Sequence, residues 1–205
     1  MRTGEPIPTV NFYFRKENPN FTGIDKMDWH IVNSTDLFRD KKCIVIGLPG
    51  PFTPVCSSFQ VPQYEKFYND FIYEYNIDEI YVTSTMDYFV MEAWKEKLKL
   101  KNLKMLPDGN ANWARLLGMY VNREEFGYGY RSWRYACLIN NNVIERLFAE
   151  PNPEDKLGND PYGESSPQNV LEWLRRKKKG ENLKEEWLYP QNLTHNRIYG
   201  VEGDK

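Results

Sequence analysis

The stretch CIVIGLP, residues 43–49, constrains the fold more than any other part of the chain. It follows two lysines and contains no charged or amide side chain. An apolar run of this length, without alternating polar residues, is typical of a strand that is buried on both faces. Such strands occur in α/β domains, where helices cover the sheet. We therefore expect residues 43–49 to be a central strand of a sheet covered by helices.

The segments on either side of this run predict further strands. Short apolar or aromatic runs place them at 10–15, 77–85 and 103–106. Residues 134–139 and 143–150 flank Asn140–Asn142, and asparagine tolerates the positive φ of a tight turn, so a hairpin is expected there. Residues 16–28 are polar and contain proline and glycine, which predicts a loop.

Helical spacing of apolar residues predicts the helices. Long helices are expected at 55–75, with a kink at Pro62, and at 88–100 and 167–179. Shorter helices are expected at 112–117 and, capped by Ser34 or Thr35, through Phe38. This order of elements predicts a mixed β-sheet with helices on both faces. A thioredoxin-like three-layer α/β fold satisfies the pattern, as do other α/β folds.

Composition excludes several classes of function. The chain has 205 residues, of which 40% are hydrophobic and 27% are charged, which indicates a folded domain rather than a disordered segment. The formal net charge of −2 gives no strong attraction to nucleic acid or to an anionic membrane. No apolar run is long enough to cross a bilayer, and residues 1–10 lack the apolar core of a signal peptide. We expect a cytoplasmic protein with no nucleic-acid or membrane partner.

Cysteines and histidines are few. The three cysteines are Cys43, Cys56 and Cys137, which is too few for a disulfide framework, and none lies in a CxxC motif. The only histidines are His30 and His195, which argues against a histidine-rich metal site. We expect neither a metal nor another cofactor. A cysteine–histidine hydrolase stays possible only if one of the two histidines lies near Cys56.

The segment PGPFTPVCS, residues 49–57, carries the clearest chemical signal. It follows the expected central strand and places Cys56 in the first turn of a helix. Unpaired backbone N–H groups and the helix dipole favour a thiolate at that position. A thiolate is the nucleophilic form of cysteine, so Cys56 is the candidate reactive residue.

Read together, the neighbours of Cys56 make the signal specific. Pro49, Thr53 and Cys56 have the spacing P-x-x-x-T-x-x-C, and LPGPFTPVCSS resembles the active-site motif of type II (peroxiredoxin V-like) peroxiredoxins. Residues 126–152, with RSWRY, and residues 78–96, with the string FVMEAWKE, resemble further segments of that group. The similarity runs from about Val10 to about Leu174. Over this range the chain most resembles the peroxiredoxin half of bacterial peroxiredoxin–glutaredoxin hybrids.

The resemblance implies a thiol-dependent peroxidase with an antioxidant role, acting on hydrogen peroxide and organic hydroperoxides. Cys56 would be the peroxidatic cysteine, which becomes a sulfenic acid. Thr53 would hydrogen-bond the thiolate and the peroxide. Arg134 would stabilise charge as the O–O bond breaks, and Pro49 would shield the thiolate from water. One position departs from the family: Gln60 stands where the group often has histidine, and we expect it to alter the pocket lining or a dimer contact.

The sequence also bears on which thiol resolves the sulfenic acid. The loop before the last helix, GNDPYGESSPQ, holds only serines where some relatives carry a second cysteine. We therefore expect a one-cysteine mechanism with glutathione and glutaredoxin as the reductant, or else thioredoxin. Core packing is the favoured role for Cys43 and Cys137, although Cys137 could resolve Cys56 if it faced the same site.

We expect a peroxiredoxin domain over residues 1–180 and a C-terminal extension over 181–205. The resemblance implies a homodimer or a higher homo-oligomer. The alternative to an enzyme is a thioredoxin-fold redox sensor or binding protein with little turnover, whose partner site the extension could carry.

Overall fold

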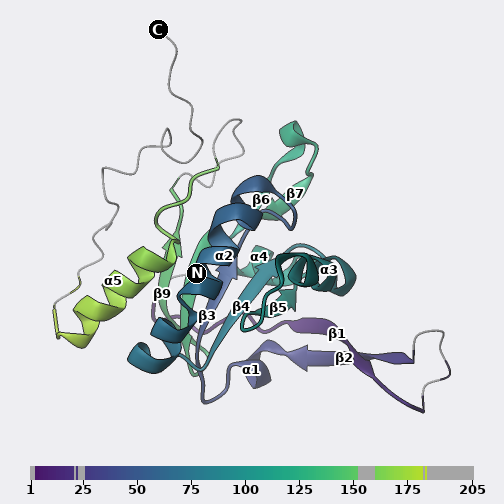
Figure 1. Cartoon of the computed structure of the whole chain (residues 1–205), viewed down its shortest axis with the longest axis horizontal. Coiled ribbons are helices and arrows are strands. Elements are labelled where there is room, and N and C mark those ends of the chain that lie inside the picture. The colour runs from purple at the N-terminus through teal and green to yellow at the C-terminus, as the bar shows by residue number, and fades with distance from the viewer. Residues whose placement is uncertain (1–2, 21, 23–25, 152–159, 182, 184–205) are drawn as a thin grey trace, which may run out of the picture.

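The computed structural model describes residues 3–20, 22, 26–151, 160–181 and 183. Its centre is a five-stranded sheet in the order β5-β4-β3-β8-β9 (Figure 1). The first three of these strands run parallel to one another, and β8 runs antiparallel to both β3 and β9. The predicted mixed sheet is therefore confirmed. The bounds of these strands are β3 Lys42–Gly47, β4 Glu79–Ser84, β5 Lys104–Pro107, β8 Tyr135–Asn140 and β9 Val143–Ala149.

Each face of the sheet carries its own apolar core. Along β3, Ile44 and Ile46 belong to one core, whereas Cys43 and Val45 belong to the other, because successive strand residues point to opposite faces. Helices α2 (Val61–Lys66), α3 (Tyr88–Leu98) and α5 (Pro167–Lys178) contribute to the first core. The second core receives residues from helix α4 (Asn112–Leu117), from the C-terminal end of α1 (Ser34–Leu37) and from strand β1 (Asn11–Glu17). The prediction of helices on both faces is thus confirmed.

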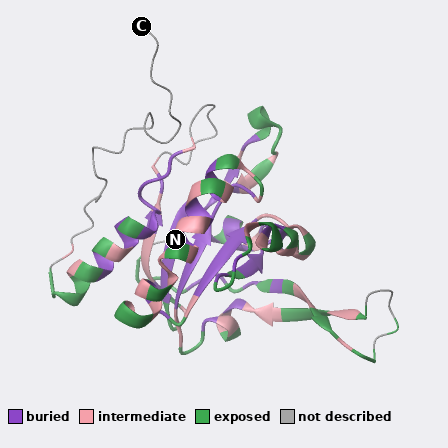
Figure 2. Cartoon of the chain, in the orientation of Figure 1, coloured by how far each residue is buried: buried purple, intermediate pink, exposed green. Residues whose placement is uncertain are grey.

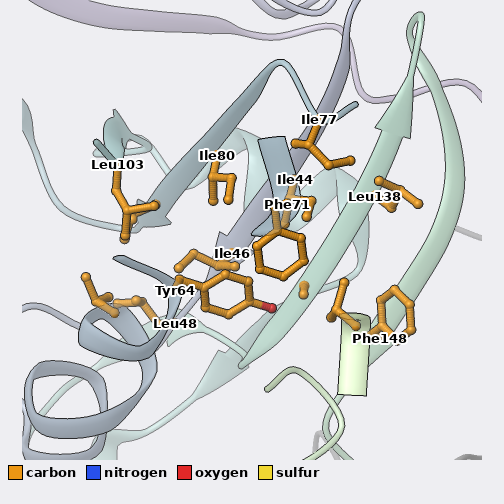
Figure 3. Close-up of a cluster of buried hydrophobic side chains, with 14 of the residues drawn as sticks. Ile44, Ile46, Leu48, Tyr64, Phe71, Ile77, Ile80, Leu103, Leu138 and Phe148 are labelled. Atoms are coloured by element: carbon orange, nitrogen blue, oxygen red, sulfur yellow. The ribbon is translucent and has the colours of Figure 1, made fainter. Parts of the chain in front are cut away.

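The core on the α2 face contains the residues that lie behind Cys56. Tyr64 from α2 stacks on Phe71 with ring centroids 5.7 Å apart, and both rings lie against isoleucines of the central strands (Figure 3). Strands β3, β4 and β8 are almost wholly buried and β9 is mostly half-buried, while the outer faces of the helices are exposed (Figure 2). This packing gives the segment that carries Cys56 a rigid support.

The hairpin between β8 and β9 forms as its asparagines predict. Asn141 and Asn142 have φ of 46° and 65°, the left-handed values that a two-residue hairpin turn requires. At the other end of β8, Gly47 of β3 pairs with Tyr135. A Cβ at Gly47 would lie 2.1 Å from Tyr135 Cε1, so the close approach of this ring requires glycine.

The helix expected over 55–75, with its kink at Pro62, forms as a series of helical turns that are not regular α-helix throughout. The backbone makes π-helical turns at Cys56–Gln60 and Asp70–Glu74, with α2 between them. Pro62 follows the first of these π-helical turns, and the backbone is helical on both sides of it. Because Pro62 has no N–H to donate, the helical hydrogen-bond ladder is interrupted at this position.

The N-terminal region also differs from the expectation. Asn33 caps α1, because its side-chain oxygen accepts a hydrogen bond from Thr35 N at 3.0 Å. Ser34 is buried instead, and its hydroxyl donates to Pro8 O at 2.7 Å. The expected loop at 16–28 is shorter, since β1 runs to Glu17 and pairs with β2 (Met27–Asn33).

A second small sheet was not expected. Strands β6 (Tyr120–Asn122) and β7 (Tyr130–Ser132) pair as a short hairpin around a 3₁₀ turn at Glu124–Phe126. Three-residue strands are too short for a pattern of alternating polarity to reveal them. Most of the expected extension at 181–205 lies outside the described residues. No helix in the described part of the chain has the length and apolarity that crossing a membrane requires.

Candidate active site

Cys56 lies at the start of the π-helical turn that follows β3 and the 48–55 loop. Its side chain is fully buried. The preceding turn is held by two hydrogen bonds: the Thr53 hydroxyl donates to Gly50 O at 2.7 Å, and Ser57 N donates to Thr53 O at 3.0 Å. Pro49 is buried in the same loop. Three of the four residues expected in the site thus lie within one fixed turn.

Arg134, the fourth expected residue, reaches Cys56 from the neighbouring strand of the sheet. It immediately precedes β8, and its side chain is 0% exposed. The guanidinium Nη1 lies 3.4 Å from Cys56 Sγ. The structure therefore brings the cysteine and the arginine into direct contact.

The environment of Arg134 keeps it charged. Burial lowers the pKa of its guanidinium, but the negative charges of Cys56 and Asp160 outweigh burial and raise the pKa above its ordinary value. A buried cation needs anions or acceptors around it, and here these are a cysteine sulfur and a carboxylate. The guanidinium in turn stabilises negative charge on the sulfur.

Gln60 is buried one turn after Cys56 and is part of this cluster. Its Oε1 accepts a hydrogen bond from Arg134 Nη1, and its Nε2 donates to Gly47 O at 3.4 Å. The side chain is 0% exposed. The sequence predicts that Gln60 alters the pocket lining or a dimer contact, and the structure adds that Gln60 contacts Arg134 directly.

Sequence reasoning missed three residues near Arg134: Asp160 and Tyr162, which contact its guanidinium, and Glu150, whose backbone N–H donates to Arg134 O at 3.0 Å. Asp160 Oδ1 forms an ion pair with Arg134 Nη2. Tyr162 places its ring 5.9 Å from the Arg134 guanidinium carbon and donates its hydroxyl to Gln63 Oε1 at 2.7 Å.

The third missed residue is Glu150, which is 1% exposed. Its Oε1 accepts from Gly163 N, Ser165 N and the Ser165 hydroxyl at 2.9, 2.8 and 2.7 Å. The sequence signal for Glu150 was its position directly after an apolar strand. A buried acid there has to accept hydrogen bonds from nearby donors.

The other two cysteines lie on the opposite face of the sheet. Cys43 and Cys137 belong to the core beneath α4, whereas Cys56 belongs to the core beneath α2. Burial raises the pKa of both thiols to about 12. They behave as core residues in this fold, as the sequence predicts.

Neither histidine completes a hydrolase site in the described residues. His30 is exposed on β2, whereas Cys56 is buried, and His195 lies outside the described part of the chain. Among the described residues, no three His, Cys, Asp or Glu side chains are grouped so as to hold a metal ion. The chemistry of the cluster is that of a cysteine sulfur, a guanidinium and a hydroxyl.

Comparison with known proteins agrees with this arrangement. The chain matches the Redoxin family over residues 3–161. A peroxiredoxin of Rhizobium etli is 42% identical over 85% of this chain and 97% of its own length. The hybrid peroxiredoxin hyPrx5 of Haemophilus influenzae is 40% identical over 83% of this chain and 65% of its own length.

Solved structures give the same result. The antioxidant protein of Plasmodium falciparum, described as a 1-Cys peroxiredoxin, superposes with a TM-score of 0.78 at 32% identity, over 84% of this chain and 99% of that one. Reduced Prx3 from Vibrio vulnificus in complex with H₂O₂ superposes with a TM-score of 0.71 at 28% identity, over 87% and 98%. These matches confirm the predicted thioredoxin-like fold. The chain belongs to the peroxiredoxins, a family of thiol-dependent peroxidases.

Proposed function

We propose that Cys56 is the peroxide-attacking residue of this peroxidase. The observation that carries the proposal is the 3.4 Å contact between Arg134 Nη1 and Cys56 Sγ at a buried helix start. The thiolate attacks one peroxide oxygen, so an S–O bond forms as the O–O bond breaks. The other oxygen leaves with the electron pair and takes a proton. The products are Cys56 sulfenic acid and water or an alcohol.

The surrounding groups act on the charge that develops in this step. Arg134 supplies a fixed donor for the departing oxygen, which needs no reorganisation during the reaction. The Thr53 hydroxyl donates to Gly50 O, which leaves its oxygen lone pairs to accept a hydrogen bond from the peroxide O–H. Pro49 has no N–H and helps to keep water away from the sulfur. Hydrogen peroxide and small organic hydroperoxides are the proposed substrates, because the burial of Cys56 favours small molecules over bulky ones.

An outside thiol reduces the sulfenic acid in the proposed cycle. Cys43 and Cys137 lie in the core on the far face of the sheet from Cys56, so a disulfide with either would require the sheet to open. The resemblance to the peroxiredoxin half of peroxiredoxin–glutaredoxin hybrids supports glutathione and glutaredoxin, with thioredoxin as the alternative. We further propose a homodimer as the working unit, which sedimentation at micromolar concentration would test.

The intact mass of the reduced protein after one equivalent of hydrogen peroxide tests the chemistry. We expect a gain of one oxygen atom in the wild type and in a Cys43→Ala/Cys137→Ala control, and none in Cys56→Ser. A loss of two hydrogens would indicate an internal disulfide and contradict the one-cysteine cycle. An unchanged mass would contradict the proposed peroxidase chemistry of Cys56. Turnover with glutathione and glutaredoxin, compared with thioredoxin, then identifies the reductant.

A further inference from the structure

The Arg134 guanidinium divides its donors between two sides of the site. Nη1 faces Cys56 Sγ and Gln60 Oε1, whereas Nη2 is paired with Asp160 Oδ1. A guanidinium is a planar and rigid fork, so an acceptor that fixes one nitrogen also fixes the direction of the other. We propose that Asp160 is a positioning residue for peroxide reduction, which aims Nη1 of Arg134 at the reacting sulfur. This inference rests on the proposed role of Cys56.

The difference in burial between the two partners supports this role. Arg134 is 0% exposed and Asp160 is 30% exposed, so the carboxylate closes the outer side of a buried cation. Without it, Nη2 would be a buried charged donor that has lost its anionic partner, and the guanidinium would gain by turning toward solvent. The same movement would take Nη1 away from Cys56.

The segment that follows Asp160 is held in place from two directions. Two residues later, the Tyr162 hydroxyl donates to Gln63 of α2, and the Tyr64 hydroxyl of α2 donates to Ser165 O at 2.7 Å. From the side of β9, the Glu150 carboxylate accepts both backbone and side-chain donors of Ser165. The carboxylate of Asp160 is therefore preorganised relative to the helical segment that follows Cys56.

Two reactions of the same sulfur separate positioning from a purely structural role. Alkylation by iodoacetamide needs the thiolate but no donor aimed at a peroxide oxygen. Peroxide reduction needs both the thiolate and the correctly aimed guanidinium. Loss of positioning therefore slows the reaction with peroxide much more than alkylation, whereas general damage to the fold changes both.

The test compares Asp160→Ala, Asp160→Asn and Asp160→Glu with the wild type. The matched control is Asp36→Asn, which breaks the exposed Asp36–Arg39 pair. We expect the alanine variant to react with hydrogen peroxide roughly tenfold to a hundredfold more slowly, while its alkylation rate stays within about twofold. Asp160→Glu should recover more of the peroxide rate than Asp160→Asn, because it retains the charge.

Two results would overturn the role of Asp160. One is a wild-type peroxide rate in Asp160→Ala, and the other is an equal proportional loss of the peroxide and alkylation rates. The wild type and Cys56→Ser, measured beside these variants, report separately on the proposed function. If the wild type oxidises at Cys56 while Asp160→Ala does so at the same rate, only the positioning role fails.

Discussion

Arg134 and Cys56 are 78 residues apart in the chain, yet Nη1 of one lies 3.4 Å from Sγ of the other. The sheet explains this contact. Strands β3 and β8 are antiparallel neighbours, and Gly47 at the end of β3 pairs with Tyr135 at the start of β8. The loop that leads to Cys56 therefore begins at the same end of the sheet where Arg134 precedes β8.

Replacing Arg134 by lysine should separate charge from geometry. Lysine retains one positive charge but lacks the planar fork that contacts Cys56, Gln60 and Asp160 together. We expect the rate of Cys56 oxidation by hydrogen peroxide to fall by about a hundredfold, as for loss of an aligned donor. Stopped-flow tryptophan fluorescence measures this rate, with the exposed Arg39→Lys as control. A rate within about twofold of the wild type would contradict the role of the fork.

Gln60→Leu should weaken both the site and the fold. The substitution removes the oxygen that accepts from Arg134 and the amide that donates to Gly47 O, in a side chain that is fully buried. Leaving these partners unpaired costs about 1–3 kcal/mol of unfolding free energy. Urea unfolding measures that loss, and the peroxide rate should fall with it. Gln60→His, which places the residue common in related proteins there, should retain more of both; equal loss in the two variants would count against the hydrogen bonds.

Cys43 and Cys137 should resist alkylation in the folded protein. Burial raises the pKa of both thiols to about 12. Near pH 8, each thiol is therefore ionised in only about one molecule in ten thousand. Mass spectrometry of peptides after iodoacetamide treatment should find both cysteines labelled in denaturant and protected without it. Rapid labelling of Cys137 in the native state would show that the far face of the sheet opens.

The burial of Asp108 should give the unfolding free energy a pH dependence opposite to the usual one for a carboxylate. Burial raises its pKa from 3.8 to about 6, although hydrogen bonds from Ala114 N and Trp113 N lower it in part. The folded state therefore retains a proton that the unfolded chain releases between these values. The contribution of this group to stability is complete below about pH 4 and is lost as the pH rises through about 6, by about 3 kcal/mol.

Asp108→Asn removes this titration. The unfolding free energy of the wild type, measured relative to that of the variant, should decrease between about pH 4 and about pH 6.5. Urea unfolding at closely spaced pH values measures the difference. A constant difference across this range, or an increase with pH, would show that the carboxyl does not titrate as its burial predicts.

The main strands and the reactive turn follow from local patterns. Apolar runs predict β3, β4 and β8, because a strand buried on both faces is made largely of apolar residues. The spacing of Pro49, Thr53 and Cys56 is local as well, so the sequence shows it directly. These elements depend on burial and on turn chemistry, which neighbouring residues report.

Other features depend on contacts that neighbouring residues do not report. Strand β2 exposes Trp29 and Ile31, so its apolar residues do not mark a buried face. Asp160 meets Arg134 only because Glu150, Tyr64 and Gln63 fix the segment that follows it. Similarly, the spacing of apolar residues around Cys56 predicts a helix but not the π-helical type of its first turn.

The hydrogen bonds of Glu150 have a consequence for how this family can vary. One carboxylate oxygen binds Gly163 and Ser165, and so joins the end of β9 to the start of the segment before α5. Because the two anchor points are joined directly, the number of residues between them can change while Asp160 keeps its place near the second anchor. The place of Asp160 beside Arg134 is therefore set by these bonds at Gly163 and Ser165, and not by the length of chain between the two anchors.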